Sequence, residues 1–210
     1  MPVESGGEGV VGLLLAGGQA RRMGGGDKCL RTLAGETLLA RAIARARSQV
    51  SHLLLNANGG PGRFASYGLT VVPDVIDGFA GPLAGVLSGL TWLSARQPET
   101  AWLATFPTDA PFFPLDLVSR MRAVATEQGA KVVCAASGGR SHPVFGLWHG
   151  SLKDDLERAM VDEGTRKIDA WTATHGLIEV GYDCEPIDPF FNANRPEDLE
   201  SAALLLAEMS

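Results

Sequence analysis

The sequence predicts an α/β fold, in which helices cover both faces of a mostly parallel β-sheet to give a three-layer sandwich. Short apolar segments alternate with helical patterns along most of the chain, which is typical of such a sheet. Hydrophobic residues make up 45% of the sequence and charged residues 20%, which is enough apolar surface for a sheet buried on both sides. The 210 residues suit one domain of this kind and are short for two.

Seven short apolar segments are expected to form the strands. The first of them consists only of Val, Leu and Gly, as expected for a buried central strand. Only a few residues lie between the fifth and sixth segments, and residues 137–141 among them contain two glycines, so we expect a hairpin there and one antiparallel strand in the sheet. The expected strands span residues 10–15, 53–56, 69–72, 101–106, 131–136, 144–148 and 177–180.

Helical patterns fill most of the gaps between these strands. The first pattern has apolar side chains on one side and arginines on the other, which is typical of an amphipathic helix that covers a sheet. Pro82 and Pro114 fit the first turn of two later helices, and Glu197 and Asp198 fit the first turn of the last one. The expected helices span residues 37–50, 82–95, 114–127, 152–161, 166–174 and 196 onward.

Charge and composition narrow the range of partners and compartments. The formal net charge of −6 does not suit a nucleic-acid-binding surface. No apolar run approaches the length of a membrane span, and residues 1–9 carry an acid where a secretory signal would be basic. We therefore expect a cytoplasmic protein with a flexible leader over residues 1–9 and one domain over residues 10–210.

Three cysteines, Cys29, Cys134 and Cys184, lie far apart in the sequence. Their spacing indicates neither a disulfide framework nor a zinc site, and it fits a reducing compartment. Cys29 stands beside Lys28, so it is either a somewhat activated thiol or a buried bystander that behaves as a small apolar residue.

The segment that follows the first strand predicts a phosphate-binding loop. Residues 15–28 read LAGGQARRMGGGDK, and their glycines let backbone N–H groups approach a ligand while their cations add positive charge. The segment is not a Walker A motif, and its glycines do not form the G-x-G-x-x-G pattern of dinucleotide-binding loops. The alternative is a mobile glycine turn with solvated cations. The residues concerned are Gly17, Gly18, Arg21, Arg22, Gly24, Gly25, Gly26 and Lys28.

Polar side chains follow three further strands. Asn56 ends the second, Asp74 follows the third and Asp109 follows the fourth. Ligands of open α/β sheets bind beyond these carboxyl ends, so we expect the three side chains and the glycine-rich loop to line one crevice. Asp109 stands between Pro107 and Pro111 and is the candidate ligand for Mg²⁺, which usually takes one or two protein carboxylates and completes its shell with phosphates and water.

Each of these three residues also has an ordinary interpretation. Asp109 could cap the helix that follows it, Asp74 could be a turn residue after Pro73, and Asn56 could end its strand in a turn instead of binding a purine edge or a ribose through its amide.

The order of the motifs resembles that of the molybdenum cofactor guanylyltransferases, and the resemblance covers essentially the whole chain. It implies a Rossmann-like fold of the nucleotide-diphospho-sugar transferase type. Two departures are modest: Thr108 and Ala110 flank the acid where Cys and Thr are expected, and Arg195 stands where a capping Thr is usual. The matching motifs are residues 15–28, Asn56-Ala57-Asn58, Asp74, residues 81–85, residues 107–111, His142-Pro143 and residues 191–199.

The resemblance implies an Mg²⁺-dependent enzyme that transfers GMP from GTP to the terminal phosphate of molybdopterin, releases pyrophosphate and supplies molybdoenzymes or their chaperones. Lys28, Arg22 and Asp109 are the expected catalytic residues, because fixed cations and Mg²⁺ stabilise charge on the phosphoryl oxygens and on the departing pyrophosphate. The role of Arg21 stays open. The residues implied in nucleotide binding are Leu15, Ala16, Gly17, Gly18, Lys28, Asn56, Asp74 and Asp109.

The acceptor substrate is expected to bind the part of the chain from about 138 to 210, and the nucleotide the part from about 10 to 137. His142 could bind an anionic acceptor, and the resemblance directs Asn192 and Asn194 to the pterin pocket. Alternatively, His142 is a packed turn residue and the two asparagines satisfy local backbone groups. Two other functions stay open: a related cytidylyl or sugar-phosphate nucleotidyltransferase, and a non-catalytic GTP-binding module.

Overall fold

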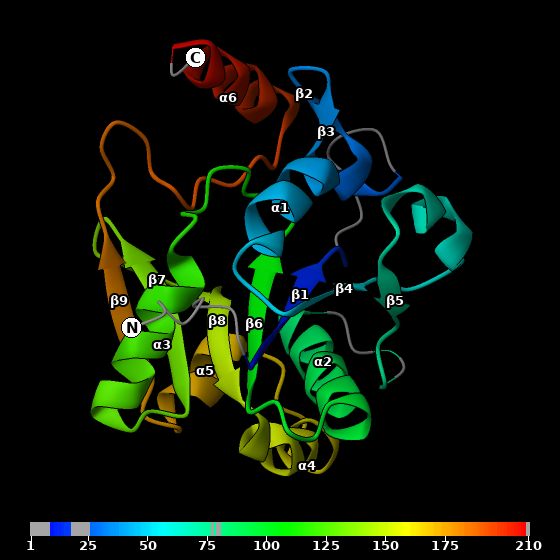
Figure 1. The fold of residues 1–210 in the computed structure, drawn as a ribbon, viewed down its shortest axis with the longest axis vertical. Helices are drawn as coiled ribbons and strands as arrows, with labels where there is room; N and C mark the ends of the chain where they lie inside the picture. Colours follow the sequence, from blue (N-terminus) through cyan, green and yellow to red (C-terminus); the bar gives the residue numbers. More distant parts are fainter. Residues whose placement is uncertain (1–8, 18–25, 77, 79–80, 209–210) are drawn as a thin grey trace, which may run out of the picture.

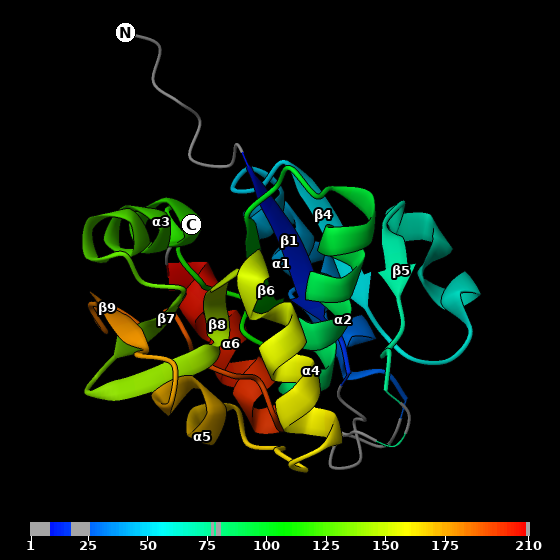
Figure 2. The ribbon, with the colours of Figure 1, turned by 90° about the horizontal axis from the view of Figure 1, so that it is seen from below.

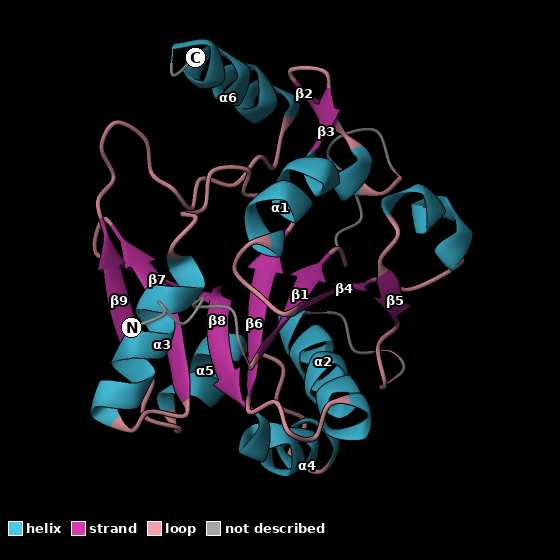
Figure 3. Cartoon of the chain, in the orientation of Figure 1, coloured by secondary structure: helices cyan, strands magenta, loops and turns pink. Residues whose placement is uncertain are grey.

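The computed structural model describes residues 9–17, 26–76, 78 and 81–208, and it shows the predicted α/β fold (Figure 1). Within these residues, seven strands form one sheet, and each lies on a predicted segment (Figure 3). They are β1 (Val10–Leu15), β4 (His52–Asn56), β5 (Thr70–Val72), β6 (Trp102–Pro107), β7 (Val132–Ser137), β8 (Arg140–His149) and β9 (Ile178–Tyr182).

The predicted hairpin and its reversed strand are confirmed. The strand order is β5-β4-β1-β6-β8-β7-β9, and β8 runs antiparallel to both β6 and β7. The turn is shorter than expected, because β8 begins at Arg140 and only Gly138 and Gly139 separate it from β7. Their φ angles of 54° and 74° suit a type I′ turn, which glycine adopts without strain.

The direction of strand addition reverses at β1. The chain passes from β1 to β4 and β5 on one side and then crosses to β6 on the other side, and all four strands are parallel. Leu15 pairs with both Asn56 and Pro107, so three strands end side by side. This reversal is the switch point at which open α/β sheets bind their ligands.

Helices cover both faces of the sheet. Val10 and Leu14 of β1 belong to the core under α1 (Leu38–Arg47) and α3 (Leu117–Gln128), whereas Val11 and Leu13 belong to the opposite core. Figure 2 shows α3 and α5 on opposite sides of β7 and β8. In the described part of the chain, no helix is both long enough and apolar enough to cross a membrane. The opposite core is covered by α2 (Pro82–Arg96), α4 (Lys153–Val161) and α5 (Ile168–Ala173).

Some short elements lie outside the predicted ones. β2 (Thr32–Leu33) and β3 (Glu36–Thr37) form a small hairpin, and the 3₁₀ helices η2 (Lys28–Leu30) and η3 (Pro61–Tyr67) precede β2 and β5. The last helix, α6 (Pro196–Glu208), begins at the predicted proline but packs beside the β2–β3 hairpin instead of on the sheet (Figure 1). This third core contains the buried residues Leu33, Leu38, Phe112 and Ala202.

Candidate functional site

Three residues predicted from distant parts of the sequence meet at the switch point. Lys28 Nζ lies 2.6 Å from Asp109 Oδ2 and 2.6 Å from Asn194 Oδ1. Lys28 comes from η2, Asp109 from the turn after β6, and Asn194 from the connection between β9 and α6. Lys28 is only 9% exposed, so its charge is shielded from bulk water and is balanced by the carboxylate. The arrangement joins the two parts of the chain that were expected to bind different substrates.

The turn that carries Asp109 is held by backbone contacts. Leu15 O accepts hydrogen bonds from Thr108 N at 3.3 Å and from Thr108 Oγ1 at 3.1 Å. Asp109 O accepts a hydrogen bond from Ala193 N at 2.8 Å. The N-cap residue of α3 is Asp116, so the alternative that Asp109 caps this helix is wrong.

Asp109 has chemistry that suits a Mg²⁺ ligand. Its side chain is 27% exposed and follows a strand end at the switch point. Within the described residues, no group of three or more His, Cys, Asp or Glu side chains could hold a metal ion. A Mg²⁺ ion at Asp109 would therefore need oxygen ligands from substrate phosphates and water, which is its usual coordination at nucleotide sites.

Asp74 is held by two amide side chains. Asn56 Nδ2 donates to Asp74 Oδ1 at 2.9 Å, and Asn58 Nδ2 donates to Asp74 Oδ2 at 2.7 Å. Asn58 Oδ1 also accepts a hydrogen bond from Asp74 N at 2.9 Å. Asn56 further donates to Val72 O at 3.1 Å and is 5% exposed, so its amide donors are used inside the protein. The structure thus uses Asn56 to orient Asp74, not to offer a free amide to a base.

The glycine at position 85 lets α2 lie close to Asn56, which holds Asp74. A Cβ atom at Gly85 would lie 2.6 Å from Asn56 Oδ1 and 2.6 Å from Leu15 Cδ2, closer than side chains tolerate. The motif at residues 81–85 therefore has a packing role beside the site. It allows the first turns of α2 to lie against the ends of β1 and β4.

Part of the predicted phosphate-binding loop can be placed. Ala16 N donates to Asn56 O at 3.0 Å, and Ala16 is buried while Gly17 is exposed. The chain therefore leaves β1 at the switch point, as expected. The predicted loop residues Gly18, Arg21, Arg22, Gly24 and Gly25 lie outside the described residues.

His142 is packed inside the second part of the chain. Its Nε2 lies 2.8 Å from Ser137 Oγ, and Ser137 Oγ donates to Asp188 Oδ1 at 2.8 Å. Its ring packs against Phe190, with a centroid distance of 4.9 Å, and the residue is 8% exposed. Burial lowers the pKa of His142, which favours the neutral ring. This is the packed-residue alternative, and it does not bring His142 to Lys28.

The two asparagines near the end of the chain differ. Both residues are exposed, and Asn194 contacts Lys28 through its side chain, whereas the placement of Asn192 at the acceptor stays a prediction. Asp198 Oδ2 accepts hydrogen bonds from Asn194 N at 2.7 Å and from Arg195 N at 2.8 Å. Asp198 thus holds the two backbone N–H groups that precede α6, as the acid of a capping box does.

An ion pair near Lys28 could not be read from the sequence. Arg63 of η3 binds Asp27, the residue before Lys28, with Nε to Oδ2 at 2.6 Å. Burial, with a contribution from the Asp27 charge, raises the pKa of Cys29 to about 12, which favours the buried bystander over the activated thiol. Arg63 is separated from the motif in sequence, and no spacing signal pointed to it.

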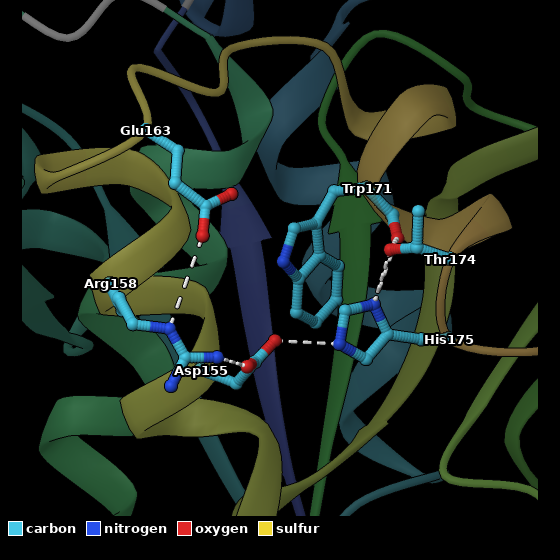
Figure 4. Close-up of polar contacts among 6 residues, drawn as sticks. All are labelled: Asp155, Arg158, Glu163, Trp171, Thr174 and His175. Carbon is cyan, nitrogen blue, oxygen red and sulfur yellow. Dashed lines mark hydrogen bonds and ion pairs between the residues drawn. The ribbon is translucent and has the colours of Figure 1, made fainter.

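A second polar cluster joins α4 to the residues after α5 (Figure 4). His175 Nε2 lies 2.7 Å from Asp155 Oδ2, and the His175 ring stacks on Trp171 at 3.9 Å. Thr174 Oγ1 is 3.0 Å from His175 Nδ1, so the three polar residues line up as in a hydrolytic triad. However, the Thr174 hydroxyl donates its proton to Trp171 O at 2.8 Å and not to His175, so His175 does not activate it as a nucleophile. The cluster holds two helices together.

The sequence is similar to curated proteins over nearly its whole length. The model of the MobA-like NTP transferase domain matches residues 12–176. A molybdenum cofactor guanylyltransferase from Nitrobacter hamburgensis is 52% identical over 196 residues, which cover 93% of this chain and 94% of the relative. A protein of the same name from Rhizobium meliloti is 38% identical over 195 residues, which cover 90% of this chain and 88% of the relative.

Solved structures share the fold. Molybdopterin-guanine dinucleotide biosynthesis protein A from Archaeoglobus fulgidus superposes with a TM-score of 0.76 at 21% identity, covering 95% of this chain and all of that one (100%). A CMP:2-keto-3-deoxy-manno-octonic acid synthetase complexed with CTP gives a TM-score of 0.71 at 10% identity, covering 96% of this chain and 99% of that one. These likenesses show the nucleotidyltransferase fold alone. Together with the sequence matches, they mean that the chain belongs to the molybdenum cofactor guanylyltransferase family of MobA-like NTP transferases.

Proposed function

We propose that this protein transfers GMP from GTP to the terminal phosphate of molybdopterin and releases pyrophosphate. The observation that carries the proposal is the contact of Lys28 with Asp109 and Asn194 at the switch point. This contact unites a cation for phosphate, a carboxylate for Mg²⁺ and a segment of the part expected to bind the acceptor. The relatives that are 52% identical bear the name of this activity, which supports the same assignment.

The proposed reaction needs charge neutralisation more than a strong base. A phosphate oxygen of molybdopterin attacks the α-phosphorus of GTP, and the bond from that phosphorus to the bridging oxygen breaks, so pyrophosphate leaves with the electron pair. The attacking phosphate is already anionic. Lys28 Nζ would stabilise the charge on the α-phosphoryl oxygens and on the leaving group. Mg²⁺ held by Asp109 would supply Lewis-acid neutralisation of the same phosphates.

The remaining assignments follow from position. We propose that the loop from Leu15 through Gly17 and Gly18 cradles the phosphates with its backbone N–H groups, and that Arg22 assists at the β and γ phosphates. Asp74, oriented by Asn56 and Asn58, would face the nucleoside. Exposed Asn192 would contact the acceptor. The product would pass to molybdoenzymes or their chaperones in the cytoplasm.

The test is pyrophosphate release with Mg²⁺, molybdopterin and each of GTP, CTP, UTP and ATP. We expect turnover with GTP in strong preference to the others, because a site built for the O6 acceptor and the N1–H and N2–H₂ donors of guanine leaves polar groups unpaired with another base. Equal or faster turnover with CTP would contradict the guanylyl assignment and indicate a cytidylyltransferase. GTP binding without pyrophosphate release would indicate a non-catalytic module. Arg47→Ala, in the exposed last turn of α1, is the matched control and should react as wild type.

A further inference from the structure

Arg63 joins two loops that border the candidate site. Its Nε donates to Asp27 Oδ2, its Nη2 to Asn58 O and its Nη1 to Gly60 O, each at 2.6 Å. Nη2 also lies 3.4 Å from Asp27 Oδ1, so two nitrogens face the carboxylate. The planar fork of a guanidinium makes all these contacts at once, which the single nitrogen of a lysine cannot do.

Each of the two loops leads to a residue of the site. Asp27 directly precedes Lys28, and Asp27 O accepts a hydrogen bond from Leu30 N at 3.2 Å, which closes the turn that carries Lys28. On the other loop, Asn58 Nδ2 holds Asp74 Oδ2 at 2.7 Å. Arg63 therefore stands between the backbone of Lys28 and the loop that orients Asp74.

Arg63 is itself well anchored. The adjacent Phe64 is 1% exposed, and the Arg63 guanidinium carbon lies 4.4 Å from the Phe64 ring centroid, a cation–π contact. The side chains of Arg63 and Asp27 are 30% and 26% exposed, so water reaches the ion pair only in part. An exposed ion pair of this size adds little to stability. Any larger effect of this ion pair would therefore be on the relative position of the two loops.

We infer that Arg63 is a positioning residue for the nucleotide site. By binding Asp27 on one side and the carbonyls of Asn58 and Gly60 on the other, it fixes the place of Lys28 relative to Asp74 and does not itself touch substrate. The inference rests on the proposed function, which gives Lys28 and Asp74 their roles. A residue needed only for folding would lower stability without a specific effect on GTP turnover.

The first experiment is a double-mutant cycle in steady-state pyrophosphate release. We expect Arg63→Ala, Arg63→Lys and Asp27→Asn each to lower kcat/KM for GTP by about 10- to 100-fold, because a displacement of about 1 Å at a reacting centre has effects of that order. The double variant Arg63→Ala/Asp27→Asn should lose no more than Arg63→Ala alone, since Arg63→Ala already removes the contact with Asp27. Arg47→Ala, which also removes one exposed arginine, should keep the wild-type value.

The second experiment does not depend on activity. Amide hydrogen exchange should become faster at residues 26–30 and 58–60 in Arg63→Ala, while the melting temperature stays close to that of wild type. If wild type releases no pyrophosphate with any nucleotide, the proposed function fails, and the exchange rates still test the positioning.

Three results would overturn the positioning role. The first is wild-type kinetics in Arg63→Lys, which would mean that charge alone suffices. The second is a loss of kcat/KM in the double variant that equals the product of the two single losses. The third is wild-type exchange rates at residues 26–30 and 58–60 in Arg63→Ala. Should Arg63→Ala fail to fold, Arg63→Lys and Asp27→Asn allow the same kinetic and exchange comparisons.

Discussion

Residues 10–137 and residues 138–210 contribute to the candidate site in different ways. In the first part, Asp74 follows β5 and Asp109 follows β6, which belong to one group of four parallel strands, so the sheet itself places both residues at the same edge. In the second part, Asn194 comes from a long connection between β9 and α6, and tertiary contacts place it. Ala193 N bonds to Asp109 O, and Ser137 bonds to Asp188 further back along the same connection.

The difference shows that the residues of one site can be held with unequal rigidity, some by the sheet and others by a connecting segment. A strand end moves only with its sheet, whereas a connection depends on a few side-chain and backbone bonds and opens more easily. We therefore expect changes in the first part to act mainly on chemistry, and changes in the second part to act on how the connection is held.

Lys28→Ala should have the largest effect and tests the first half of this comparison. Turnover should fall by about 10²- to 10³-fold, the range for loss of one preorganised group that stabilises the transition state. The chain should still fold, because Lys28 makes polar contacts with Asp109 and Asn194 and does not belong to the hydrophobic clusters of the core. Circular dichroism and pyrophosphate release measure both quantities. An unchanged rate in a folded variant would remove Lys28 from the catalytic residues.

Asp109→Asn should reduce the rate by about 10²-fold at low Mg²⁺ and move the Mg²⁺ requirement to higher concentration, because the amide lacks the charge that holds a hard cation. Unfolding without ligand should need roughly 1 kcal/mol less, since Lys28 exchanges a charged hydrogen-bond partner for a neutral one. The checks are rate against Mg²⁺ concentration and chemical denaturation. Superimposable Mg²⁺ curves would show that Asp109 is not the metal ligand.

Ser137→Ala tests the second half of the comparison. The variant leaves His142 Nε2 and Asp188 Oδ1 without their shared partner, and we expect the free energy of unfolding to fall by about 1–3 kcal/mol. The KM for molybdopterin should rise more than the KM for GTP, because the connection carries the proposed acceptor residues. Ser201→Ala, on the exposed side of α6, is the control and should change little. Equal changes in the two KM values would argue against the idea that the connection between β9 and α6 acts on the acceptor alone.

Acid should have the smallest effect, and it acts through His142. Burial lowers the pKa of His142, Asp188 partly opposes this shift, and Arg140 adds to it. The folded protein thus favours the neutral ring, so this stability is complete above about pH 6.5 and is lost as the pH falls through the lowered pKa. Each such group changes the free energy of unfolding by at most about 1.4 kcal/mol per pH unit.

Urea denaturation at several pH values between about 7.5 and 5 measures this dependence. His142→Asn should reduce the slope of stability against pH without removing it, because burial also lowers the pKa of His149. Identical slopes in wild type and variant would exclude His142 as a contributor.

The sequence predicted the sheet well because its strands are strongly apolar and its turns carry glycine or proline. The β2–β3 hairpin has strands of two residues each, too short for any alternation of apolar and polar side chains. η3 begins with Pro61 and Gly62, which indicate a turn and hide a helical segment, and this is why Arg63 was not found.

Within the site, residue position was predictable and side-chain orientation was not. Asp109 could be placed at a strand end from the pattern alone. The amide of Asn56 turns inward because Val72 O and the Asp74 carboxylate accept its donors, and no one-dimensional pattern contains that information. The same holds for His142, whose partners Ser137 and Asp188 lie on the neighbouring strand and in a distant connection.

The glycine at position 85 has a consequence for attempts to stabilise this protein. Alanine is ordinarily preferred to glycine inside a helix by about 1 kcal/mol, so Gly85→Ala is a natural choice in a thermostabilisation library. Here the added methyl group would press on Asn56, which two hydrogen bonds hold in place, and on Leu15. The substitution would then disturb Asp74 through Asn56 without touching it, and we expect it to lower both the melting temperature and the activity.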